Sequence, residues 1–166
     1  MKRLLLGTIV IAIQTACGPS QSVEPAQPAP DFALRFDHKG CHFEYLDTFK
    51  GTYSHVGSGP PVPFTLSNEQ RTTLFAAVMA ADFFDRPADL GTGKEPPDNY
   101  ELEVQNAGRL HTVRWTVESR WFQSEDGRPL RMLQDTIFKV LENHPDVLRL
   151  PRRGDGCSMG PPPSIR

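Results

Sequence analysis

Alternating apolar and polar residues predict several short strands in the first half of the chain. Apolar side chains recur at every second position over residues 32–37 and 41–47, which is the period of a strand with one buried face. A third strand over residues 52–56 follows the turn-forming pair Lys50-Gly51. We therefore expect three strands joined by tight connections.

The strongest alternation predicts a β-hairpin over residues 100–117. A two-residue loop at Ala107-Gly108 places every apolar residue of both strands on one face, and a slip of one residue would destroy this match. The same register sets Glu101 opposite Arg114 on the other face, where we expect an exposed ion pair.

Helical spacing of apolar residues appears in two places. Ser67, with Gln70 three residues later, has the pattern of a capping box that begins a helix, and Arg86-Pro87 ends it. Pro129 suits the first turn of the second helix, which ends near Asn143. The expected buried stripes are Leu74, Phe75, Val78 and Met79 in the first helix and Leu130, Leu133, Ile137, Val140 and Leu141 in the second.

The order of these elements is strands, helix, hairpin, helix. That order predicts an α+β domain, with an antiparallel β-sheet and two α-helices packed on one face.

The N-terminus has the features of an export signal. Lys2 and Arg3 precede an apolar run over residues 4–13, which at ten residues is shorter than the ~20 that a membrane-spanning helix needs. Small residues then precede Cys17, and this arrangement resembles a bacterial lipoprotein signal. The resemblance implies acyl chains on Cys17 and, because Gly18 follows, an outer membrane lipoprotein facing the periplasm or the exterior. The alternative is ordinary signal cleavage, which would leave a secreted soluble protein.

Composition divides the chain into four parts. They are a signal peptide over residues 1–16, a lipid anchor and Pro-rich tether over 17–30, a folded domain over 31–150, and an irregular Pro- and Gly-rich tail over 151–166. Without Lys2 and Arg3, the mature chain holds 16 basic and 20 acidic residues, a net charge of −4. An acidic balance of this kind argues against nucleic acid as a partner.

With Cys17 lipidated, Cys41 and Cys157 are left as a pair. Because disulfides persist in oxidising compartments such as the periplasm, we predict a bridge between them that ties the tail to the sheet. Two unpaired thiols are the alternative.

Two motifs of common enzyme sites are missing from the sequence. It has no phosphate-binding loop and no His-Glu-x-x-His, and we expect a non-enzymatic protein without a cofactor. His38, Cys41, His42 and His55 could form a metal site, but Cys41 and His42 would point to opposite faces of a strand, so we predict no metal site there.

Trp121 and Phe122 are the best candidates for contact with a partner. They lie in a polar connection over residues 118–128 that we expect to be exposed, and aromatic residues are enriched at binding hot spots. The alternative is that they fold back and cap the core. The proline-rich loop over residues 57–63 is a second candidate.

Several segments together are similar to the emfourin family of small proteins. They are Leu66-Ser67 and the helix after it, Ala81-Asp82-Phe83-Phe84, the strand that contains Tyr100, Gly108-Arg109, and His111-Thr112-Val113. The resemblance covers roughly residues 32–141. It implies a binding domain that inhibits secreted thermolysin-like metalloproteases. A structural, envelope-associated lipoprotein that contacts another envelope protein is the alternative interpretation.

Overall fold

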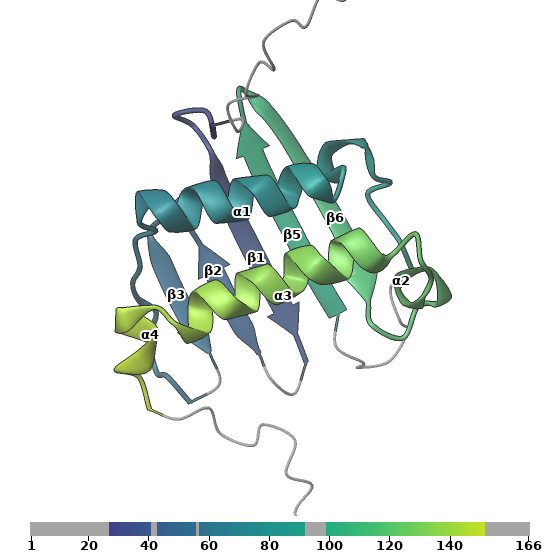
Figure 1. Ribbon diagram of the computed structural model, residues 1–166. Helices are drawn as coiled ribbons and strands as arrows, with labels where there is room; N and C mark the ends of the chain where they lie inside the picture. The colour runs from purple at the N-terminus through teal and green to yellow at the C-terminus, as the bar shows by residue number, and fades with distance from the viewer. Residues whose placement is uncertain (1–26, 41–42, 56, 92–98, 152–166) are drawn as a thin grey trace, which may run out of the picture.

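A six-stranded antiparallel sheet covered on one face by helices forms the domain (Figure 1). The computed structural model describes residues 27–40, 43–55, 57–91 and 99–151. In chain order the elements are β1 (Ala33–Lys39), β2 (Glu44–Asp47), β3 (Thr52–His55), β4 (Val62–Pro63), α1 (Asn68–Ala80), the short 3-10 helix η1 (Phe83–Asp85), β5 (Asn99–Asn106), β6 (Arg109–Thr116), α2 (Arg120–Gln123), α3 (Arg128–Glu142) and α4 (Pro145–Leu148). The predicted α+β class and element order are confirmed.

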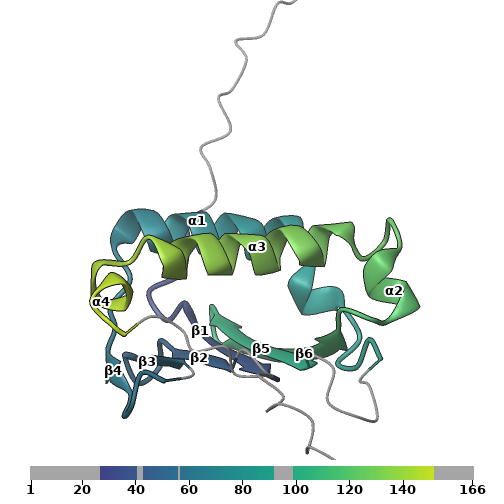
Figure 2. The ribbon, with the colours of Figure 1, turned by 90° about the horizontal axis from the view of Figure 1, so that it is seen from below.

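The strand order in the sheet is β4-β3-β2-β1-β5-β6, so the first strand lies in the interior of the sheet. The hairpin β5–β6 joins this interior strand through β5, which pairs with β1 along all seven residues of β1. Helices α1 and α3 both lie across the same face, as predicted, and no helix of the described chain covers the opposite face (Figure 2).

The hairpin has the register that the sequence predicts. Asn106 pairs with Arg109 and Glu101 with Arg114. Ala107 and Gly108 both have positive φ, 51° and 74°, as a two-residue turn with the twist of the flanking strands requires. Asp31 holds this turn, because its carboxylate accepts the N–H groups of Ala107 and Gly108 at 2.8 and 2.7 Å. The Gly108 N–H in particular lowers the pKa of Asp31.

The helices bury the stripes that were predicted, with one exception. The capping box of Ser67 and Gln70 is present, and every predicted stripe residue of α3 is buried. In α1 the prediction was wrong for Met79, whose side chain is 47% exposed. Met79 lies about 140° around the helix from Leu74, and Ala81 continues the buried stripe instead.

Four short elements were not predicted. β4 adds an edge strand at the end of the loop that was expected over 57–63, and α2 is a single turn in the connection that was expected over 118–128. α4 is a single turn that follows the predicted end of the second helix near Asn143, and the fourth element is η1. The helix α1 ends before Arg86, because Asp82 adopts a left-handed conformation with φ 47° and η1 follows. A left-handed residue stops a helix, and Asp tolerates it better than most residues do.

Both edges of the sheet are protected against pairing with another chain. At one edge β4 is two residues long and contains Pro63, which has no N–H to donate. At the other edge, the N–H and the carbonyl of Arg114 in β6 bond to Ala88 and Leu90, both at 2.9 Å. A segment between η1 and β5 thus covers this part of β6.

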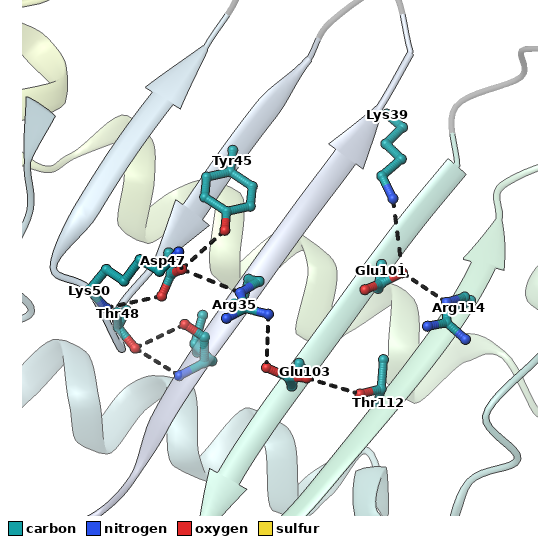
Figure 3. A network of polar contacts seen from close by, with 11 residues as sticks. Arg35, Lys39, Tyr45, Asp47, Thr48, Lys50, Glu101, Glu103, Thr112 and Arg114 are labelled. Atoms are coloured by element: carbon teal, nitrogen blue, oxygen red, sulfur yellow. Dashed lines mark hydrogen bonds and ion pairs between the residues drawn. The ribbon is translucent and has the colours of Figure 1, made fainter. Parts of the chain in front are cut away.

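Paired charges cover the face of the sheet that carries no helix (Figure 3). Arg35 in β1 bridges two neighbouring strands, because it contacts Asp47 of β2 at 3.3 Å and Glu103 of β5 at 3.2 Å. Farther along the face, Arg114 contacts Glu101 at 2.8 Å, the ion pair that the register predicted. The charges therefore run across strands, and they connect β2, β1, β5 and β6.

Asp47 is the most buried member of this network, with a side chain that is 0% exposed. It accepts hydrogen bonds from the Tyr45 hydroxyl at 3.0 Å and from the Lys50 N–H at 3.1 Å, in addition to the contact with Arg35. Burial raises the pKa of Asp47, but the hydrogen bonds and the Arg35 charge outweigh it, so the pKa lies below its ordinary value of 3.8.

We expect Asp47→Asn to lower the free energy of unfolding at neutral pH by about 1–3 kcal/mol, because it removes the charged acceptor of three donors. The low pKa in the folded state means that the carboxylate stabilises the domain above pH 3.8 and that this contribution is lost as the pH falls through the folded pKa. Urea unfolding of the wild type and the variant should therefore differ at neutral pH and converge at acid pH. An equal difference at both pH values would contradict this role, and Glu103→Gln, at a more exposed partner of Arg35, should cost less.

Candidate functional site

Three of the predicted site residues lie outside the described part of the chain. They are Cys17, the predicted lipid attachment site, and Cys41 and Cys157, the predicted disulfide pair. Lipidation and the bridge stay predictions. Within the described ranges, no helix is both long and apolar enough to cross a bilayer.

Phe122 lies in the core, so the alternative interpretation, that it folds back and caps the core, is the one that holds for this residue. Its side chain is 4% exposed and stacks on Trp115 with ring centroids 6.4 Å apart. Ser119 caps the short helix α2 by accepting the Phe122 N–H at 3.1 Å, and this turn directs Phe122 inward. A buried ring cannot offer the contact area of a hot spot, so the predicted pair is reduced to Trp121.

Trp121 is half-buried at the surface, where Arg86 covers its ring. The guanidinium carbon of Arg86 lies 5.1 Å from the ring centroid, within the range of a cation–π contact. Two hydrogen bonds hold the side chain of Arg86 in place. Its Nε donates to the Ala81 carbonyl at 2.7 Å and its Nη1 to the Asp126 carbonyl at 3.2 Å. The two side chains therefore form a preorganised aromatic–arginine pair.

A small pocket of about 180 Å³ opens beside this pair. We call it the corner pocket, and its lining residues are Asp82, Asp85, Arg86, Pro87 and Trp121. The elements that build it are η1 and α2, which come from parts of the sequence more than 30 residues apart. Four of the five lining residues were not predicted as site residues. Arg86-Pro87 was interpreted only as a helix stop, Asp82 only as part of the emfourin-like segment over residues 81–84, and Asp85 lies in no motif.

Two side chains at the start of β6 form hydrogen bonds with the residues around the corner pocket. Arg109 donates from Nη2 to the Phe84 carbonyl at 2.7 Å and to the Asp85 carboxylate at 2.8 Å. Two residues on, Nε2 of His111 lies 2.8 Å from the Arg86 carbonyl, which can only accept, so this nitrogen carries the proton. Residues of two separate segments that resemble the emfourin pattern thus meet at one corner, and there they shape the backbone around the pocket.

The buried histidines of the sheet form no comparable site. His38 stacks on Tyr100, with centroids 4.4 Å apart, while Glu44 accepts a hydrogen bond from the Tyr53 hydroxyl at 2.9 Å. Among the described residues, no three histidine, cysteine, aspartate or glutamate side chains are grouped so that they could hold a metal ion. Cys41 and His42, two of the four residues considered for a metal, lie outside the described chain.

Comparison with known proteins adds no assignment. No model of a known protein family matches the chain, and no curated protein matches it. The similarity to emfourins thus rests on the segments quoted above.

Gly127 fixes the position of α2, because a Cβ at this residue would come within 3.0 Å of the carbonyl oxygens of both Trp121 and Phe122. Its backbone is in the ordinary right-handed region, so the close approach is what requires glycine. We expect Gly127→Ala to push α2 away from α3 and to lower the free energy of unfolding by about 1–3 kcal/mol.

Urea unfolding followed by the NMR signals of the indole N–H groups would test this role of Gly127. The Trp121 signal should shift in the variant. Thr73→Ala, at an exposed position of α1, is a matched control that should change neither quantity appreciably. Wild-type stability together with an unmoved Trp121 signal would show that the backbone at Gly127 has room for a side chain.

Proposed function

We propose that this protein is a membrane-tethered lipoprotein outside the cytoplasm whose α+β domain binds another protein and does not catalyse a reaction. The observation that carries the proposal is the corner pocket, where a half-exposed tryptophan and a fixed arginine lie together. Tryptophan and arginine are among the residues most enriched at binding hot spots. The N-terminal signal and the Pro-rich tether support the location.

The rigidity of the corner supports binding as its use. Backbone carbonyls hold Arg86 in place, and Gly127 allows α2 to pack closely against the start of α3. Side chains that are already fixed lose little conformational entropy when a partner docks, which favours affinity. The emfourin-like segments make a secreted thermolysin-like metalloprotease the first partner to test, with inhibition as the expected consequence of binding.

Titration of a thermolysin-family protease with the full chain carrying Cys17→Ser should show stoichiometric loss of proteolytic activity. If the corner pocket makes the contact, Trp121→Ala should weaken inhibition by about thirtyfold or more, because truncation of a hot-spot residue costs about 2 kcal/mol or more. Met132→Ala, at an exposed position of α3 that does not line the pocket, should leave inhibition unchanged.

An absence of inhibition across several such proteases would reject the inhibitor proposal. Capture of a different envelope protein by the same chain would then favour the alternative, a structural or envelope-associated lipoprotein.

Membrane fractionation tests the proposed anchor. We expect the wild-type protein to pellet with membranes and Cys17→Ser to appear in the soluble fraction, because several acyl chains on one cysteine anchor a protein stably whereas the polar tether does not. Cys157→Ser is the matched control and should still pellet. If Cys17→Ser also pellets, the proposed lipid attachment is wrong.

A further inference from the structure

We propose that the corner pocket binds one lysine or arginine side chain that projects from the surface of a partner protein. This inference rests on the proposed function as a protein-binding domain and adds the chemical character of the partner. It follows from the size of the pocket, the nature of its walls and the charges that its lining leaves unpaired.

The size of the pocket limits what can enter. Its volume of about 180 Å³ is below the roughly 300–1,000 Å³ that pockets for drug-sized ligands and cofactors occupy. The pocket therefore fits one side chain better than a whole small molecule, and a projecting residue of a protein partner is an occupant of the right size.

The walls suit a cation with an apolar stem. Trp121 and Pro87 provide apolar ring surface, and lysine and arginine pack their methylene stems against surfaces of this kind while the charged group reaches polar partners. The molecule already shows that the indole accepts a guanidinium, because Arg86 occupies this position at 5.1 Å. Because Arg86 covers part of this indole, a partner cation would contact the part of the ring that Arg86 leaves exposed.

The charges on the lining favour a cation over an anion. The lining contains two carboxylates, those of Asp82 and Asp85, and one guanidinium, that of Arg86. Two nitrogens of this guanidinium already donate to backbone carbonyls. Asp85 pairs with Arg109 at 2.8 Å, but both side chains are more than half exposed, so the pair is weak and open to exchange.

Asp82 makes no ion pair or side-chain hydrogen bond within the described part of the chain, although its left-handed backbone is held by the end of α1. It is thus the carboxylate that remains available to a partner. An acidic side chain in the pocket would instead face both aspartates.

NMR titration of the full chain carrying Cys17→Ser with N-acetyl-arginine amide tests the inference directly. The chain has two tryptophans, so the signals of the two indole N–H groups report on two places. We expect a saturable shift of the Trp121 signal. The Trp115 signal should stay in place, because this indole is buried and donates to Gln134 at 2.9 Å.

Neutral and acidic probes decide whether charge matters. N-acetyl-citrulline amide, which has nearly the same shape without the charge, should bind at least threefold more weakly, and N-acetyl-glutamate amide should not shift the Trp121 signal. Asp82→Asn should remove most of the preference for arginine over citrulline. Asp135→Asn, at an exposed position of α3, should leave it intact.

Equal shifts with arginine and citrulline, a response to the glutamate probe, or an unchanged preference in Asp82→Asn would overturn the inference. These outcomes are separate from the fate of the proposed function, because the probe titration involves no protein partner. A pocket that prefers arginine in a domain that captures no protein would refute the proposed function alone, whereas protein capture without that preference would refute this inference alone.

Discussion

The structure depends on the constraint that helices cover only one face of the sheet. Each long strand must then present apolar side chains to α1 and α3 and polar side chains to water, and the period of two residues makes any slip in register costly. The uncovered face meets this constraint with cross-strand ion pairs centred on Arg35. Exposed pairs add little energy one by one. Asp47 differs because it is buried and accepts several donors, so it fixes the turn between β2 and β3 as well as the pairing of β2 with β1.

Much of the fold could be predicted because a sheet that is covered on one face requires a regular pattern of apolar and polar residues, and the sequence shows this pattern. In the hairpin the alternation is long enough to fix both the turn and the pairing of Glu101 with Arg114. In α3 a stripe of five apolar residues defines the buried face. Met79 was placed wrongly, because a position at the margin of a stripe is decided by what packs nearby, and helical spacing alone does not supply that information.

The candidate site was harder to predict, because it depends on contacts between distant segments. Trp121 and Phe122 are adjacent in a polar segment, yet one capped turn of helix sends Phe122 into the core and leaves Trp121 at the surface. Asp82 becomes part of the pocket through a left-handed backbone that has no sequence signature when the residue is not glycine. The role of Gly127 lies in a close approach of backbones, which composition and spacing do not reveal.

The two edges of the sheet also bear on the proposed binding of a partner protein. A sheet with a long open edge can bind an extended segment through backbone hydrogen bonds, a mode that is tolerant of sequence. Here the strand at one edge, β4, is two residues long and contains Pro63. The strand at the other edge, β6, is hydrogen-bonded in part to the segment around Ala88. The proposed recognition of a partner must then rely more on side chains. The segment that covers β6 also contains Pro87, which lines the corner pocket, so the same stretch of chain that protects the edge helps to build the pocket that we propose as the site of side-chain recognition.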